Sequence, residues 1–194
     1  MEVEAALRAQ SGPVRFEGWS LADADLRDLD LSRCAFVRCR AGRVRLSSSD
    51  LTEARFTGCD LNNAVCLNTG LSAAQFADCK MTGIQIVGGA TLGLSFARCL
   101  LVSAALKGLS FRRAVLDQLD FAGADLAGAD FREAVFTGCS LRDANVTDAR
   151  FEGADLRGAD LGALRLGDAA RFKGAVISRP QAAALLSGLG LKVM

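Results

Sequence analysis

The side-chain types that could carry out chemistry are few in this sequence. The chain of 194 residues has no histidine. It therefore lacks the usual general base, the commonest metal ligand and the partner that a serine or cysteine nucleophile normally needs. Cysteine, aspartate and arginine remain as candidates. We expect a protein that is not an enzyme and that holds no metal and no cofactor.

The cysteines follow a regular spacing that favours packing over reactivity. Five of the seven are separated by twenty residues or a multiple of twenty: Cys39, Cys59, Cys79, Cys99 and Cys139. They occupy a position that alanine fills elsewhere in the chain, which is typical of small buried side chains. Side chains running parallel along a stack have poor geometry for disulfide bonds. We therefore predict buried free thiols.

Aspartates recur in Ala-Asp-Leu units, where each one singly is expected to bond to the backbone near a turn. Collectively they could space carboxylates along a surface much as phosphates are spaced along a duplex. From residue 111 to residue 170 the chain has eleven acidic and seven basic residues. The candidate partner-contact residues, called here the acidic track, are Asp120, Asp125, Asp130, Asp155 and Asp160.

Five arginines lie within the thirteen residues from Arg33 to Arg45, which raises the possibility of phosphate binding. However, Asp60 follows Arg40 by twenty residues and Glu53 follows Arg33 by the same step. Ladders of alternating charge are the simpler interpretation, and the net charge of +1 adds no sign of a nucleic-acid footprint. We expect no direct contact with nucleic acid.

The elements that position these residues follow from a period of five. Counting in fives from Phe16 to Leu166 gives thirty-one positions, of which twenty-five are Leu or Phe. The position two residues earlier is Ala or Cys in nineteen of thirty-one cases, and the other three positions are mostly polar. Each pentad thus has two inward residues and three outward residues.

A period of five fits neither an α-helix nor a flat strand. A chain that turns a corner of about 90° every five residues can point every pentad centre inward, and four pentads then form a coil of twenty residues. Six phenylalanines support this coil because twenty or a multiple of twenty separates them: Phe16, Phe36, Phe56, Phe76, Phe96 and Phe136. We predict an all-β, right-handed quadrilateral β-helix of nearly eight coils.

Glycines recur two residues after a pentad centre, where a corner can require a positive φ angle. These are Gly18, Gly58, Gly83, Gly123, Gly128, Gly153 and Gly158.

The two ends depart from the repeat, which predicts three segments. Residues 1–13 form an N-terminal cap, residues 14–170 form the β-helix, and residues 171–194 form a C-terminal helix and tail. Ser178 and Gln181 are spaced as a capping box, which predicts a short helix at about 179–187. This tail either caps the last coil alone or also joins two subunits. The candidate dimer interface is its apolar face, Ala182, Leu185, Leu186 and Leu189.

The segment from 61 to 110 carries only four charged residues. It places apolar side chains at nominally outward positions, namely Val65, Leu67, Val87, Leu92, Leu100 and Val102. These form either an apolar contact patch or scattered surface residues.

At this point the repeats resemble a known family. FEGADLRGADL, residues 151–161, resembles the signature of the pentapeptide repeat proteins. Residues 76–111 and 171–193 resemble its topoisomerase-protecting branch, which includes the quinolone-resistance proteins and the albicidin and cystobactamid self-resistance proteins. The resemblance implies a homodimer that mimics DNA and shields DNA gyrase or topoisomerase IV from poisons. Close DNA mimics are strongly acidic overall, so contact here is expected through the local acidic track.

The expected function is therefore a non-enzymatic binding protein that protects a bacterial type II topoisomerase from antibiotics. The alternative is a scaffold or interaction protein with another protein partner. The N-terminus is acidic where a signal peptide is basic, and no apolar run approaches membrane-spanning length. We expect a cytoplasmic protein without membrane contact.

Overall fold

The computed structural model describes residues 2–9, 12–162, 169–188 and 190. The chain divides into two compact units, Met1–Ala105 (unit 1) and Leu106–Met194 (unit 2). Unit 1 begins with helix α1 (Glu2–Ala9) and unit 2 contains a 3-10 helix, η1 (Ala169–Phe172), and helix α2 (Arg179–Gly188). Ten strands lie between the two α-helices: β1 (Arg15–Glu17), β2 (Ala35–Val37), β3 (Arg55–Thr57), β4 (Val65–Leu67), β5 (Gln75–Ala77), β6 (Gln85–Val87), β7 (Ser95–Ala97), β8 (Val115–Asp117), β9 (Val135–Ser140) and β10 (Asp155–Asp160).

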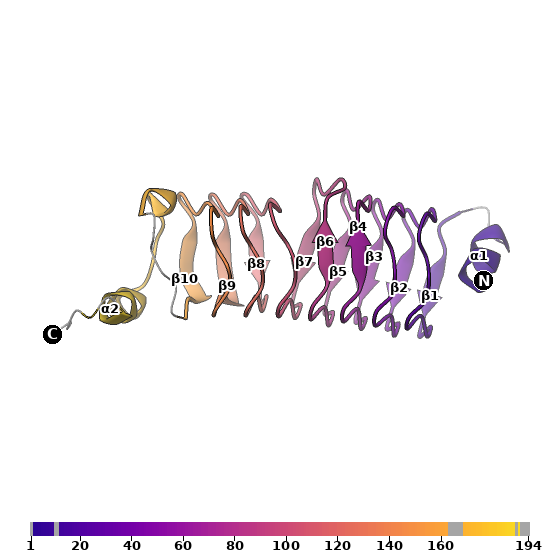
Figure 1. The fold of residues 1–194 in the computed structure, drawn as a ribbon, viewed down its shortest axis with the longest axis horizontal. Helices are drawn as coiled ribbons and strands as arrows, with labels where there is room; N and C mark the ends of the chain where they lie inside the picture. The colour runs from indigo at the N-terminus through magenta and orange to yellow at the C-terminus, as the bar shows by residue number, and fades with distance from the viewer. Residues whose placement is uncertain (1, 10–11, 163–168, 189, 191–194) are drawn as a thin grey trace. The chain divides into compact units, whose positions relative to one another are not determined.

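The strands stack in parallel with a register of twenty residues, as the period predicts. In unit 1, β1, β2, β3, β5 and β7 form one wall, and β4 and β6 form part of another. Phe16 aligns with Phe36, and Phe36 with Phe56. In unit 2, β8, β9 and β10 stack in the same way (Figure 1). The chain is a right-handed quadrilateral β-helix of about seven turns. The count of nearly eight coils included residues 163–168, which lie outside the described residues.

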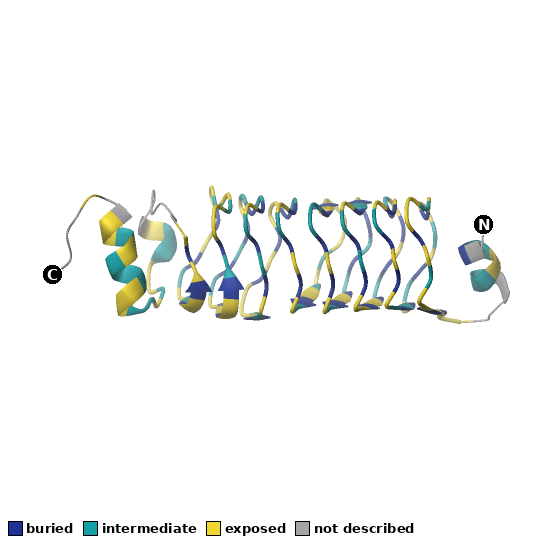
Figure 2. Ribbon diagram, turned by 90° about the horizontal axis from the view of Figure 1, so that it is seen from below, coloured by how far each residue is buried: buried dark blue, intermediate teal, exposed yellow. Residues whose placement is uncertain are grey.

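The interior is built from the pentad centres and the small residues two positions before them. Buried and exposed residues alternate along each coil for this reason (Figure 2). The rings of Phe16, Phe36, Phe56, Phe76 and Phe96 stack with centroids 4.5 to 5.4 Å apart. A second column in unit 2 joins Phe111, Phe131, Phe151 and Phe172 at 4.9 to 5.0 Å. Stacked aromatic rings therefore line an inner side of each unit.

All seven cysteines are buried and free, which confirms the prediction of unpaired thiols. In the repeated column, Cys59 Sγ donates to the carbonyl of Phe36 at 3.3 Å, and Cys139 Sγ donates to the carbonyl of Leu116 at 3.3 Å. Burial raises the pKa of the Cys66 thiol to about 12. All seven side chains pack the interior, and burial keeps Cys66 in the thiol form.

With the exception of Gly158, the described corners lie two residues after a pentad centre, where the backbone is left-handed. Gly18 has a φ of 69° and Gly153 a φ of 71°. The prediction is wrong at Gly158, which lies inside the six-residue strand β10 and does not have a positive φ. Its backbone passes so close to the coil beside it that an added Cβ would stand 2.2 Å from the Phe136 carbonyl oxygen. Glycine is needed there for close approach.

At the C-terminal end the solenoid continues to Val176, but the step between coils grows from twenty residues to twenty-one. The Phe151 N–H donates to the carbonyl of Arg171, the Leu156 N–H donates to the carbonyl of Val176, and Phe172 completes the aromatic column. Helix α2 begins at Arg179, which confirms the predicted short C-terminal helix. No helix within the described residues is long and apolar enough to cross a membrane.

Candidate partner-binding surface

The aspartates of the acidic track share one backbone role. Each accepts a hydrogen bond from the N–H two residues later, at 3.0 Å for Asp120 and Asp160, 3.1 Å for Asp130 and Asp155, and 3.3 Å for Asp125. These Asx turns form at the residue before an inward pentad centre, and the short carboxylate reaches forward to the N–H of the residue after that centre. The residue type is explained by the turn alone.

The register distributes the five carboxylates over all four sides of unit 2. Asp120 and Asp160 flank Ser140 in one column, as the twenty-residue coil predicts. Asp125 and Asp130 belong to the next two pentads, and Asp155 aligns with Val135 on the remaining side. The structure therefore places Asp120 and Asp160 in one column, with Ser140 between them, and leaves the other three on separate sides.

Basic side chains neutralise most of these carboxylates. Arg132 forms two hydrogen bonds with Asp130, at 2.8 and 2.6 Å, and Arg157 forms two with Asp155, at 2.9 and 2.6 Å. Hydrogen bonds from the two guanidinium groups lower the pKa of Asp130 and the pKa of Asp155. Arg142 forms a salt bridge with Asp160 at 2.7 Å, and Lys107 forms one with Asp125 at 3.1 Å. Among the described residues, Asp120 alone of the five has no recorded cationic partner.

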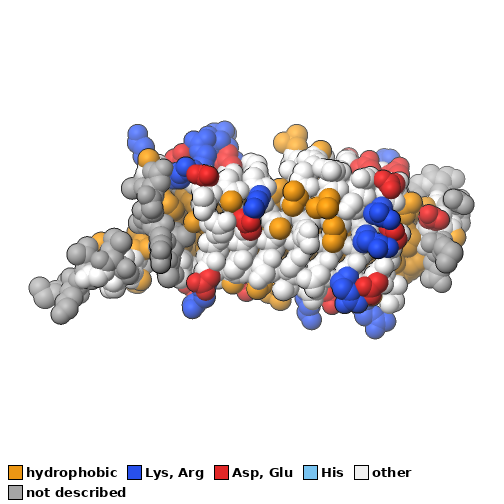
Figure 3. Space-filling view, in the orientation of Figure 1, with side chains coloured by type: hydrophobic (Ala, Val, Ile, Leu, Met, Phe, Trp, Pro, Cys, Tyr) orange, Lys and Arg blue, Asp and Glu red, His pale blue; other side chains and the backbone are white. Residues whose placement is uncertain are grey.

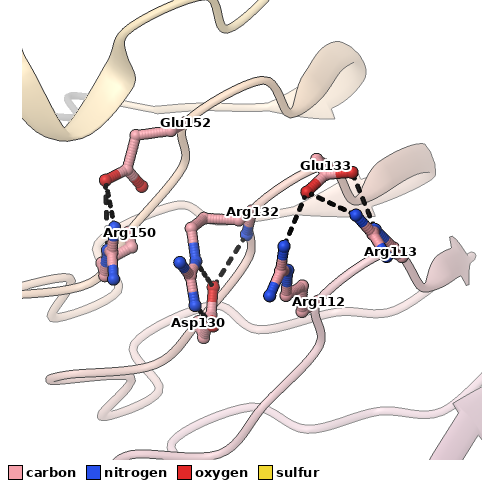
Figure 4. Close-up of polar contacts among 7 residues, drawn as sticks. All are labelled: Arg112, Arg113, Asp130, Arg132, Glu133, Arg150 and Glu152. Carbon is pink, nitrogen blue, oxygen red and sulfur yellow. Dashed lines mark hydrogen bonds and ion pairs between the residues drawn. The ribbon is translucent and has the colours of Figure 1, made fainter.

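A cluster that the sequence analysis did not single out lies on one side of unit 2 (Figure 4). This charged ladder consists of Arg112, Arg113, Asp130, Arg132, Glu133, Arg150 and Glu152. Glu133 receives hydrogen bonds from Arg112 at 3.1 Å and from Arg113 at 2.8 Å, and Arg150 contacts Glu152 at 2.8 Å. Four arginines against three carboxylates leave this side slightly basic. The signal in the sequence was charge reversal at steps of twenty and twenty-one residues.

The arginine cluster of unit 1 is also paired between coils. Arg43 reaches Asp23 at 2.6 Å, Arg45 reaches Asp25 at 3.1 Å, and Arg38 pairs with Glu17. The pairs expected for Arg33 and Arg40 are not formed in the described part of the chain. Charge ladders exist, but with different partners. Figure 3 shows the result, in which acidic and basic side chains lie next to each other.

The apolar side chains of the middle segment do not form one patch. Leu67 lies beside Val87 on adjacent strands, whereas Leu100 aligns with Lys80 on another side. Leu92 is the most exposed, at 87%, and follows the left-handed glycines Gly88 and Gly89. Val65 and Val102 are half-buried. Unit 2 adds an exposed column that the sequence analysis missed, in which Val115 aligns with Val135.

Helix α2 is fixed to the last coil by Gln181. Its side chain accepts a hydrogen bond from the Ser178 N–H at 2.6 Å, and the Gln181 N–H donates to Ser178 Oγ at 3.3 Å, which forms the predicted capping box. Its Nε2 also donates to the carbonyls of Leu156 and Ala159, both at 2.7 Å. On the apolar face Ala182 and Leu185 are half-buried and Leu186 is exposed, while Leu189 lies outside the described residues.

No group of three or more Cys, Asp or Glu side chains within the described residues is arranged to hold a metal ion. What the arrangement offers is an exterior of paired charges, two exposed apolar columns and a helix with an accessible apolar face. Such surfaces are suited to binding partners through shape and local charge.

Two solved structures agree with this architecture. Two trypsin-treated variants of QnrB1, described as a plasmid-mediated fluoroquinolone resistance protein, are each similar with a TM-score of 0.70 at 20% identity over 94% of this chain and 98% of theirs. HetL, a pentapeptide repeat protein involved in heterocyst differentiation in the cyanobacterium Nostoc, has a TM-score of 0.46 at 20% identity, covering 90% of this chain and 92% of its own. A comparison with curated proteins gives no match.

Two family models match the sequence of the solenoid. One, described as a pentapeptide repeat region, matches residues 12–86, and the other, described as pentapeptide repeats, matches residues 95–132 and 124–162. Together the matches span most of the chain and coincide with the coils observed in both units. The chain belongs to the pentapeptide repeat family.

Proposed function

We propose that this protein is a non-enzymatic binding protein that engages a bacterial type II topoisomerase, DNA gyrase or topoisomerase IV, and protects it from poisons. The observation that carries the proposal is the match to QnrB1, a fluoroquinolone resistance protein, over nearly the whole length of both chains. The resemblance of residues 76–111 and 171–193 to the topoisomerase-protecting branch supports the same assignment. Both enzymes work in the cytoplasm, which is the location we propose.

The paired aspartates alter how such a contact would form. A surface of nearly balanced charge gives little long-range steering toward a basic DNA channel, because most of the acidic-track carboxylates are compensated at short range. The proposed contact therefore depends on shape, with local charge at Asp120 and its column neighbour Asp160. Asp160 is held by Arg142, so Asp120 is the acidic-track residue most available to a basic partner.

The proposal is tested by gyrase supercoiling and by topoisomerase IV decatenation with purified protein, each with and without a quinolone and an albicidin-like poison. Protection is expected as a higher poison concentration at half-maximal inhibition. Inhibition of supercoiling by the protein alone also supports binding. If micromolar protein neither rescues nor inhibits either enzyme, the topoisomerase assignment is wrong.

Asp120→Asn tests the acidic track within this assay, because Asn keeps the acceptor that closes the Asx turn and removes the charge. We expect protection to weaken roughly two- to fivefold, since one exposed charge contributes up to about 1 kcal/mol. Asp143→Asn is the matched control, because Asp143 is an exposed acid of the same unit. Equal loss in both variants would assign the effect to net charge instead of position.

The second candidate function is an interaction or scaffold protein with another protein partner. The exposed valine column favours it, since Val115 is 70% and Val135 is 40% exposed beside the charged ladder. Val115→Lys would weaken binding to such a partner and leave the topoisomerase assays unchanged. A loss of topoisomerase protection in this variant would instead show that the valine column takes part in the topoisomerase contact.

A further inference from the structure

The first coil of unit 1 presents an unpaired backbone edge. In later coils the residues on either side of a pentad centre accept hydrogen bonds from the preceding coil. For example, the Leu21 N–H donates to the Arg40 carbonyl at 2.7 Å and the Asp23 N–H donates to the Gly42 carbonyl at 2.9 Å. Within the described residues, no coil precedes the first one. Among the described residues, no donor is recorded for the equivalent carbonyls of Ser20, Ala22, Asp25, Arg27, Asp30 and Ser32.

Helix α1 covers the interior of this coil and leaves its rim open. Val3 is buried, and Leu21 and Leu26 at the end of the core are buried as well. Two hollows flank the helix, with volumes of about 550 and 380 Å³. The larger one is lined by Val3 and Glu4 of α1 and by residues of the segment 20–28. We call it the N-terminal edge groove.

The hydrogen-bonding groups of this groove are unequal in number. Along the segment 20–28, the groups whose equivalents in later coils bond to the preceding coil are the carbonyls of Ser20, Ala22, Asp25 and Arg27 and the N–H groups of Ser20 and Asp25. Carbonyl acceptors therefore outnumber N–H donors by two to one in this part of the described chain. An occupant of the groove would bury these backbone groups, and buried backbone groups need partners, so the occupant must supply more donors than acceptors.

The charges lining the groove have the same bias. Glu4, Asp25 and Asp28 contribute three carboxylates, against one guanidinium from Arg27. Asp25 is neutralised, because Arg27 forms two hydrogen bonds of 2.7 Å with it and Arg45 pairs with it at 3.1 Å, so the excess negative charge lies on Glu4 and Asp28. No ion pair is recorded for Glu4 or Asp28 among the described residues. The groove is electronegative from both its backbone and its side chains.

We propose that the N-terminal edge groove binds an extended segment of a partner protein that carries lysine or arginine side chains. The segment adds to the first coil as a parallel strand, as in other strand-addition complexes. Its N–H groups pair with the free carbonyls, and its cationic side chains neutralise Glu4 and Asp28. This partner site is separate from the proposed topoisomerase contact in unit 2 and does not depend on it.

The test measures peptide binding to the full chain by fluorescence anisotropy. The probes are a labelled peptide in which lysine alternates with valine, its glutamate counterpart, and a form of the lysine peptide with methylated backbone nitrogens. The lysine peptide is expected to bind and the glutamate peptide is not. Methylation keeps every charge but removes the main-chain donors, so it should weaken binding by about tenfold or more.

The location is tested with Asp28→Lys and the matched control Glu53→Lys. Both native residues are exposed corner acids, with φ angles of 60° and 59°. Asp28→Lys should weaken binding of the lysine peptide by about tenfold, and Glu53→Lys should change it less than about twofold. Circular dichroism verifies that both variants are folded. Equal binding of the methylated peptide, equal effects of the two variants, or no binding of the lysine peptide would each overturn the proposal.

Discussion

At the scale of single residues, the corners show how the solenoid tolerates unfavourable backbone conformations. Within the described residues, eighteen non-glycine residues have a positive φ, among them Ala73 at 54° and Arg33 at 58°. Each such conformation costs on the order of 1 kcal/mol. At most of these corners the N–H donates a hydrogen bond to the next coil, such as that from Ala73 to the Leu92 carbonyl at 2.8 Å, and this bond offsets the conformational cost. The stacked neighbour, more than the residue type, determines the corner.

Gly158→Ala should destabilise the protein by about 2–4 kcal/mol, because the new Cβ would overlap the backbone of Phe136. The change in the free energy of unfolding can be measured with urea. Gly42→Ala is the control, since Gly42 has an ordinary φ and its nearest contact would be 3.8 Å away. We expect the control to be neutral or stabilising by up to about 1 kcal/mol. Similar values for both variants would contradict the close-approach explanation.

At the scale of elements, sequence predicts the coils and the C-terminal helix because these depend on local periodicity and capping. The five-residue spacing can be read along the chain without knowing which coils stack on one another. The capping box of Ser178 and Gln181 is formed by residues close together in the chain. The step of twenty-one residues from Phe151 to Phe172 does not follow from the five-residue period. It is recognised only because the Phe172 ring stacks on the Phe151 ring. The second role of Gln181, toward Leu156 and Ala159, likewise requires the folded coil.

Gln181→Glu should loosen α2 from the last coil. Glutamate preserves the capping acceptor but replaces two amide donors with an oxygen that faces two carbonyls, at a cost of about 1–3 kcal/mol. Faster amide hydrogen exchange in residues 179–187 is the expected result. Ala184→Glu places the same charge on an exposed position of α2 and should leave exchange nearly unchanged. Unaltered exchange in Gln181→Glu would show that the two carbonyl contacts contribute no stability.

At the scale of the whole molecule, the surface charges could not be paired from sequence. Arg132 bonds to Asp130, two residues before it, whereas Arg113 bonds to Glu133 in the next coil. Both acids were within reach of several arginines, and the choice depends on side-chain conformations that periodicity does not encode. The aspartate positions of the acidic track were therefore predictable as turn residues, but their neutralisation was not.

Acid should destabilise the protein over a defined range. The hydrogen bonds from Arg27 hold the pKa of Asp25 at about 2, and guanidinium partners also lower the pKa of Asp130 and the pKa of Asp160. A depressed native pKa contributes stability above the unfolded pKa near 4, and this contribution is lost as the pH falls toward 2. Urea unfolding at pH 7, 4 and 2.5 should give a decreasing midpoint. A constant midpoint would contradict a stabilising role of these pairs.

Homodimer formation through α2 is a further proposal at this scale. Leu185→Asp should reduce the mass measured by light scattering from that of a dimer to that of a monomer, because a charge would be placed on the apolar face. Ala184→Asp, at an exposed position of the same helix, should leave the mass unchanged. A monomeric wild type would remove α2 from consideration as an interface.

The buried cysteines allow local unfolding of the coils to be measured by thiol labelling. A thiol reagent needs both access and a thiolate, and burial denies both at Cys34, Cys66 and Cys139, where it raises the pKa of each thiol. Labelling can therefore proceed only while the surrounding coil is transiently unfolded. Mass spectrometry of each labelled cysteine over time would map opening rates along the chain, and would show whether the solenoid frays from its ends or unfolds at once.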